Sequence, residues 1–123
     1  MKAYNTDKAP AAVGPYVQAI GTENLVFTSG QLSINPENGE LVTEIKAAAR
    51  QSLENVKAIL EEAGTSMDKV IKCTVFLADI NDFAAVNEVY KEYFSDHKPA
   101  RSAIQVGALP LGGVIEIEAI ATL

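Results

Sequence analysis

The chain has 123 residues, of which 48% are hydrophobic, and its 10 basic and 16 acidic side chains give a formal net charge of −6. This length holds one core, so we expect a single domain over residues 1–123. The acidic balance argues against nucleic acid and anionic membrane surfaces as partners, because both are bound through clustered Lys and Arg. The chain begins without the apolar run of a signal peptide and offers no stretch suited to span a membrane, which predicts a cytoplasmic protein.

Cysteine and histidine are too scarce for most metal chemistry. Cys73 is the only cysteine, so no intrachain disulfide and no Cys-rich metal site can form. Its place in an apolar row of a predicted strand indicates a buried structural thiol. His97 is the only histidine, and we expect it at a helix end, where partial positive charge is favourable. We therefore expect neither a metal nor a histidine-based catalytic triad.

The first segment with unusual chemistry is residues 9–20, which begin with two prolines and a glycine and then become strand-like. Gly14-Pro15 forms a stiff bend that holds Tyr16, either as a core ring or as a lid over a small-molecule pocket. Residues 25–28 predict a buried strand that is apolar on both faces. That strand ends in Ser29-Gly30, where the glycine lets another group come close to the backbone.

The hydrophobic period changes after a loop predicted at residues 35–39. From residue 43 to 63 the apolar side chains recur every three or four positions, which predicts one long α-helix. Thr43 is its predicted N-cap, and Gly64 stands where a left-handed residue is expected after the C-terminus.

A strand and a second helix are predicted next. Residues 70–77 alternate with period two, as expected of a strand. Asp79 or Asn81 can cap the helix that follows, whose apolar stripe consists of Phe83, Val86, Tyr90 and Phe94. Asn87 lies beside this stripe, either as a boundary residue or as an amide that fastens a neighbouring loop.

An arginine stands at the start of the next predicted strand. Pro99 ends the preceding helical pattern, so Arg101 should be the first strand residue. A planar guanidinium at that position can bind a carboxylate or phosphate through two parallel hydrogen bonds. The alternative is a solvated arginine at a strand end.

Two carboxylates stand in the last predicted strand, residues 114–122, which follows a turn at residues 109–113. Glu116 and Glu118 lie on one face of it, opposite a row of apolar side chains. Glutamate is unfavourable in strands and costly to bury. At least one of the two should therefore face water, a cation or a substrate, and Glu116, nearer the turn, is the better candidate.

The order strand, strand, helix, strand, helix, strand, strand predicts an α+β fold with two helices on one face of a mixed sheet. Two helices cannot cover both faces, yet the predicted strands carry apolar residues on both sides. We therefore expect the second face to be buried against another subunit.

These features together resemble the YjgF/Rid family of reactive intermediate (imine/enamine) deaminases. The resemblance rests on four segments in the family's order, 9–20, 29–31, 99–102 and 116–121, together with Asp82, Phe83, Asn87 and Tyr90. It implies a chorismate-mutase-like fold, a homotrimer with clefts between subunits, and hydrolysis of 2-imino or enamine acids to 2-keto acids and ammonia. It also implies that neither a metal nor an organic cofactor is used.

The resemblance assigns roles to particular side chains. Arg101 would hold the substrate carboxylate, Glu116 would place or activate the water, and Tyr16 would close the cleft. The other implied substrate-binding residues are Ser29, Gly30, Asn87 and Ala103. Position 103 is cysteine in many relatives, so we expect no thiol chemistry here, although the Ala103 backbone can still donate a hydrogen bond. One arginine and one carboxylate suffice, because a protonated imine is already electrophilic and needs mainly a placed water.

Two other functions compete with this one. The same arginine cleft could serve a non-enzymatic ligand-binding or regulatory trimer that senses small keto acids. A ribonuclease is disfavoured, because the chain is acidic and shows no mixed aromatic and basic surface.

Overall fold

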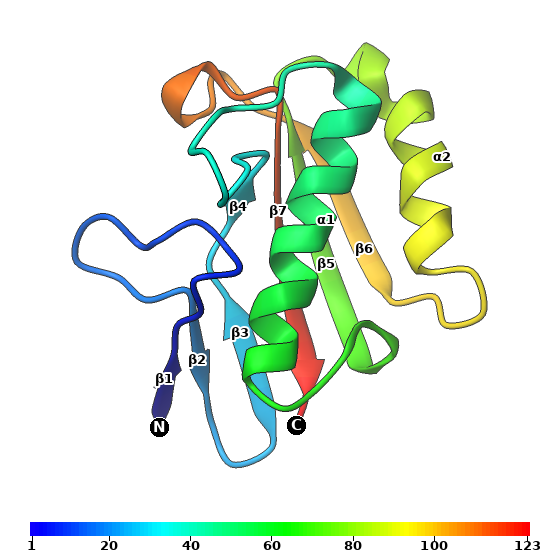
Figure 1. Ribbon diagram of the computed structural model, residues 1–123. Coiled ribbons are helices and arrows are strands. Elements are labelled where there is room, and N and C mark those ends of the chain that lie inside the picture. Colours follow the sequence, from blue (N-terminus) through cyan, green and yellow to red (C-terminus); the bar gives the residue numbers. More distant parts are fainter.

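Both α-helices lie on the same face of a mixed seven-stranded sheet (Figure 1) in the computed structural model, which describes residues 1–123. The helices are α1 (Ile45–Glu62) and α2 (Phe83–Tyr93). The strands are β1 (Lys2–Tyr4), β2 (Ala19–Gly21), β3 (Leu25–Thr28), β4 (Gln31–Leu32), β5 (Val70–Leu77), β6 (Ala100–Gln105) and β7 (Ile115–Thr122). The predicted α+β fold is thereby confirmed.

The sheet runs in the order β1-β2-β3-β7-β5-β6, and β4 also pairs with β7. Only β5 and β6 are parallel, and α2 connects them as a crossover helix. This connection places α2 beside β6, which is one of the two edge strands of the sheet (Figure 1). The short strands β1 and β4 lie outside the predicted set. In the segment predicted from residues 9–20 only β2 is a strand, because Pro10, Pro15 and Gly14, with φ +124°, keep the preceding residues out of the ladder.

The helix α1 forms as its periodicity predicts, and its apolar stripe packs against the sheet, fully buried at Ala49, Leu53, Val56 and Leu60 and partly buried at Ile45. Its predicted N-cap, Thr43, is wrong. Glu44 has the extended cap conformation, and its carboxylate accepts hydrogen bonds from the N–H groups of Lys46 and Ala47. The predicted C-terminal glycine is confirmed, since Gly64 has φ +86° directly after the helix.

The start of α2 is built in two steps. Asp79 caps a single 3₁₀ turn, η2 (Ile80–Asp82), by accepting a hydrogen bond from the Asn81 N–H. The α-helix itself begins at Phe83 without a side-chain cap. His97 lies beyond the helix end, and its ring is hydrogen-bonded to the Val70 carbonyl of β5 rather than placed in the last helical turn.

The face of the sheet that carries no helix is partly apolar. On β3 and β5, Val26 and Val75 are buried under the helices, whereas Phe27 and Phe76 point to the opposite face. Phe27 is 38% exposed there and Ile104 of the edge strand is 47% exposed. The expectation that the strands are apolar on both faces is confirmed, and a second subunit over the open face stays a prediction. Neither helix has the length and apolarity that a bilayer crossing requires.

Candidate active site

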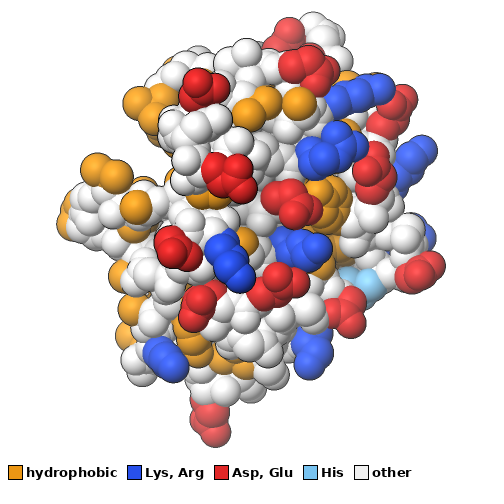
Figure 2. Space-filling view, in the orientation of Figure 1, with side chains coloured by type: hydrophobic (Ala, Val, Ile, Leu, Met, Phe, Trp, Pro, Cys, Tyr) orange, Lys and Arg blue, Asp and Glu red, His pale blue; other side chains and the backbone are white.

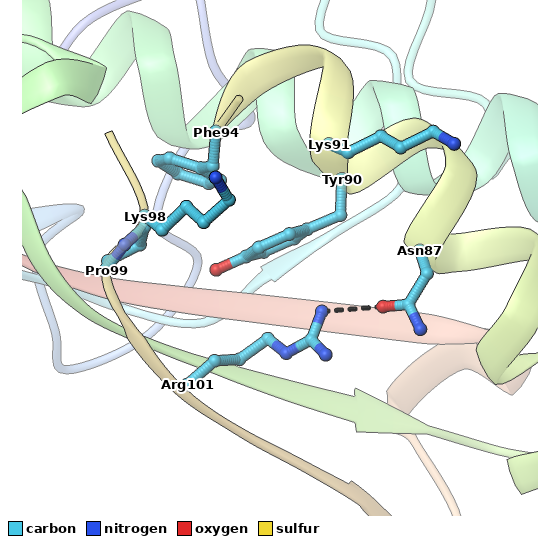
Figure 3. Close-up of a pocket in the computed structure, with 7 residues that line it drawn as sticks. All are labelled: Asn87, Tyr90, Lys91, Phe94, Lys98, Pro99 and Arg101. Atoms are coloured by element: carbon cyan, nitrogen blue, oxygen red, sulfur yellow. Dashed lines mark hydrogen bonds between the residues drawn. The ribbon is translucent and has the colours of Figure 1, made fainter. Parts of the chain in front are cut away.

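Arg101 is the second residue of β6, one position later than predicted, because the strand already begins at Ala100. It pairs with the buried Cys73 of β5, so its side chain points to the helix-covered face, under α2. There Nη1 donates a 2.7 Å hydrogen bond to Oδ1 of Asn87, as Figure 3 shows. The guanidinium carbon also lies 4.6 Å from the ring centre of Tyr90 and 5.1 Å from that of Phe83.

The charge of Arg101 has no carboxylate partner within the chain. The two ion pairs of the structure, Lys46–Glu88 and Arg50–Glu92, both join α1 to α2 at the surface. A guanidinium has five N–H donors, and Asn87 takes one of them. The side chain borders a cavity of about 460 Å³ between α2 and the start of β6. A half-buried cation with free donors beside a cavity is suited to bind an anion.

The edge strand offers a further donor beside this arginine. Val106 donates its N–H to Leu77 of β5, and successive N–H groups of a strand point in opposite directions. The N–H of Ala103, three residues earlier, therefore points away from β5 and outward from this edge of the sheet. The Ala103 side chain itself is half-buried against the core.

Glu116 lies on the other face of the sheet, in β7, where it borders a second cavity of about 430 Å³ together with Tyr16 and Gly30. The molecule is hollowed beside the loop that carries Tyr16, which projects at the left of Figure 2. Burial, and then repulsion by Glu118, raise the pKa of the Glu116 carboxyl above its ordinary value. A carboxyl with a raised pKa beside a cavity is suited both to accept and to donate a proton.

Gly30 is required for the position of this carboxyl group. A Cβ at residue 30 would lie 2.8 Å from Cδ and 3.0 Å from Cγ of Glu116, well inside ordinary contact distance. The absence of a side chain at Gly30 thus lets the Glu116 carboxylate rest directly against the backbone.

The Tyr16 loop is attached to the sheet by a residue that sequence reasoning missed. Gln18 is 2% exposed, and its side-chain amide accepts from the Thr6 N–H and donates to the carbonyls of Thr6, Ala9 and Pro10. From the sequence, a glutamine beside a loop is interpreted as a solvated residue. Only Pro10 and Pro15 indicate that residues 9–20 need an internal anchor. Tyr16 is 52% exposed, which excludes the core ring and leaves the lid as its predicted role.

The hydroxyl of Ser29 is engaged in a structural hydrogen bond. Its Oγ donates a 2.6 Å hydrogen bond to the Val17 carbonyl, and its N–H donates to the carbonyl of Gln18. It does not line the cavity that holds Tyr16, Gly30 and Glu116. Ser29 thus holds the residues next to Tyr16, and a direct role in substrate binding stays a prediction.

Within one chain the candidate residues form two separate groups. Arg101 and Asn87 lie on the helix-covered face, whereas Tyr16, Gly30 and Glu116 border the cavity associated with the open face. The registers of β6, β5 and β7 align Arg101 with Ala119, three residues from Glu116. Strand spacing and rise then put the two Cα atoms about 14 Å apart. One small substrate cannot contact both groups of the same chain.

The chain is thus an α+β protein with two incomplete sites. Arg101 and Asn87 form one at the sheet edge, and Tyr16, Gly30 and Glu116 form the other beside the projecting loop. The sequence profile of the family described as "Endoribonuclease L-PSP" matches residues 6–123. A 2-iminobutanoate/2-iminopropanoate deaminase of Escherichia coli is 50% identical over 98% of this chain and 96% of its own length. A RutC family protein of Pyrococcus abyssi is 55% identical over 94% of this chain and 92% of its own length.

Solved structures agree with this relationship. The crystal structure of Escherichia coli TdcF with bound serine has 49% identity and a TM-score of 0.96, and the match covers 100% of this chain and 99% of that one. A putative endoribonuclease of Thermotoga maritima has 51% identity and a TM-score of 0.97, with coverage of 100% and 98%. The chain belongs to the YjgF/Rid family, as its sequence motifs predict.

Proposed function

We propose that this protein is a 2-iminobutanoate/2-iminopropanoate deaminase, which hydrolyses reactive imine and enamine intermediates to 2-keto acids and ammonia. The observation that carries the proposal is Arg101, a half-buried guanidinium with no carboxylate partner beside a cavity. It would hold the substrate carboxylate, with the outward N–H of Ala103 beside it. The deaminase of Escherichia coli at 50% identity and the serine bound to TdcF support a small carboxylate ligand.

The hydrolysis needs one water and three proton transfers. Water adds to the carbon of the protonated C=N bond and forms a carbinolamine, while Glu116 takes a proton from the attacking water. Glu116 then returns the proton to the nitrogen, and the C–N bond breaks. The departing ammonia takes up the hydroxyl proton of the carbinolamine and leaves as ammonium, while the C=O bond of the keto acid forms. The raised pKa of Glu116 suits the two transfers that it makes. No step requires a metal or an organic cofactor.

The proposal includes a homotrimer with a chorismate-mutase-like arrangement, because the two groups of residues must come from different chains to meet. The edge strand with Arg101 of one subunit would face Tyr16, Gly30 and Glu116 of the next. The exposed apolar residues of the open sheet face, Phe27 and Ile104, would be covered in the same assembly. A monomer by light scattering at micromolar concentration would contradict this assembly and the shared cleft.

An assay with freshly formed imines tests the activity. A pyridoxal-dependent dehydratase or an amino-acid oxidase generates the imino acid in the cuvette, and keto acid should appear faster when this protein is present. An unchanged rate, combined with measurable binding of 2-oxobutanoate, would instead support a non-enzymatic sensor of keto acids. The face in Figure 2 intersperses Lys and Arg with Asp and Glu and forms no basic stripe, which favours a small ligand over RNA.

Mixing two inactive variants tests the shared cleft directly. Arg101→Ala and Glu116→Gln chains, co-refolded in equal amounts, should recover about a quarter of the wild-type sites, because one subunit can supply each intact group. No recovery, although subunits exchange, would assign both residues to the same chain's site.

A further inference from the structure

The groups that hold Arg101 are all electrically neutral. The Asn87 amide accepts its hydrogen bond, and the rings of Tyr90 and Phe83 lie against its guanidinium. The spacings of four and three residues place all three on one face of α2. Folded proteins usually balance a partly buried guanidinium with a carboxylate, and α2 carries two carboxylates, Glu88 and Glu92, which pair with α1 instead.

The ring of Tyr90 is itself held in place by its neighbours in the core. Tyr90 is 8% exposed, and the centres of its ring and of the Phe94 ring lie 4.7 Å apart. Its hydroxyl is buried without a hydrogen-bond partner of ordinary geometry, against the thiol of Cys73. Cys73 is the residue of β5 that pairs with Arg101. Tyr90 therefore spans from the helix to the sheet directly over the arginine, and its position constrains the plane of the guanidinium.

We infer that the Phe83, Asn87 and Tyr90 face of α2 positions Arg101 through neutral contacts alone and so leaves its full charge for the ligand's carboxylate. The inference rests on the proposed function only in taking a small carboxylate as the ligand. A carboxylate of the protein at this place would pair with the guanidinium of Arg101 and so compete with the carboxylate of the ligand. Aromatic faces and an amide orient the cation without neutralising it. The three are positioning residues, since they act through Arg101.

The variant Asn87→Asp separates this idea from a merely structural role. It keeps the shape of the side chain and strengthens the contact to Arg101, so a structural role predicts equal or higher stability and unchanged binding. We expect the melting temperature to hold, whereas the Kd of 2-oxobutanoate, measured by calorimetry, rises about tenfold or more. Asn38→Asp, on an exposed loop, is the control for the added charge. Binding of 2-oxobutanoate at wild-type affinity by Asn87→Asp would overturn the inference.

The contribution of the aromatic rings is tested by replacing Phe83 with a large aliphatic side chain. Phe83→Leu should raise the Kd of 2-oxobutanoate by about threefold to thirtyfold, and Phe83→Tyr should restore it. Tyr93→Leu is the matched control, because Tyr93 lies on α2 but contacts Glu54 of α1. In an Arg101→Lys background the loss from Phe83→Leu should shrink, since the two changes remove one shared contact.

Equal losses for Phe83→Leu and Tyr93→Leu, or losses that multiply with Arg101→Lys, would assign the rings to packing and overturn the aromatic part. If Phe83→Leu unfolds, Phe83→Met fills a similar volume and the same comparison applies. The binding series also separates the two proposals. A protein that binds 2-oxobutanoate but hydrolyses no imine contradicts the proposed deaminase and leaves the positioning of Arg101 to be decided by these variants.

Discussion

Replacing Gly30 with alanine should impair turnover while leaving the fold almost intact. The added methyl group would lie 2.8 Å from Cδ of Glu116, whereas ordinary contacts lie at 3.4–4 Å. The carboxyl group must therefore move by roughly 0.6 to 1 Å, and a displacement of about 1 Å can cost on the order of a hundredfold in rate. We expect kcat for imine hydrolysis to fall by about tenfold to a hundredfold.

The stability cost should be small, because the group that must move is the end of a flexible side chain beside a cavity. The residue has no positive φ, so alanine introduces no backbone strain. The melting temperature and the oligomeric state of Gly30→Ala should match those of the wild type, and the affinity for 2-oxobutanoate should change little because Arg101 is untouched.

Gly107→Ala is the matched control, since a Cβ there has no heavy atom within 4 Å and the residue also lacks a positive φ. It should retain the wild-type kcat. If Gly30→Ala also retained it, the location of the Glu116 carboxylate would be irrelevant to the reaction, and the assignment of Glu116 to water activation would fail.

Three further substitutions and one chemical modification test the rest of the site. Arg101→Lys keeps the charge but loses the planar fork, so kcat/KM should fall about tenfold to a hundredfold in steady-state assays, with assembly intact by light scattering. Glu116→Gln should lower kcat far more than 2-oxobutanoate affinity. Because burial and Glu118 raise the pKa of Glu116, turnover should decline as pH falls through that raised value, and Glu118→Gln should shift this acidic limb to lower pH. An alkylating reagent should leave the folded enzyme active, since Cys73 is fully buried; rapid inactivation at Cys73 without unfolding would contradict this.

The same raised pKa has a defined consequence for stability. The folded state holds the Glu116 proton more tightly than the unfolded chain does, so its contribution is complete below the unfolded pKa near 4.5 and is lost as pH rises through the raised folded value. Glu116→Gln should therefore leave the melting temperature unchanged or higher at neutral pH, which separates its catalytic loss from any damage to the fold.

Local patterns predicted the elements well because their signals lie in adjacent residues. The period of α1 located the helix to within about two residues at each end. The cap was predicted wrongly because the capping side chain is Glu44, whose carboxylate contacts the N–H groups of the first helical turn. The alternation in β7 placed Glu116 and Glu118 on one face, as found. Pro99 located the start of β6 to within one residue.

The partners of Arg101 could not be predicted in the same way. The helical period places Asn87 beside the apolar stripe, but its contact with Arg101 depends on how α2 crosses over the parallel pair β5 and β6. The separation of Arg101 from Glu116 depends on the register of three strands, which no single segment encodes. Gln18 gave no signal because its partners are backbone groups, whose identity leaves no trace in the sequence.

Gln18 anchors the loop that carries Tyr16, and this anchor can break without unfolding the rest of the protein. The free energy of opening the loop is therefore separate from the free energy of global unfolding. The side chain of one residue makes four hydrogen bonds to residues 6–10, and the loop beyond them is exposed up to Tyr16. When these bonds break, the loop can detach while the sheet and its core remain folded, as local opening requires far less free energy than global unfolding. The Thr6 amide, which donates to Gln18, should therefore exchange its hydrogen well before the amides of β5 and β7, and its exchange rate would report how often the loop that borders the cavity at Tyr16 opens.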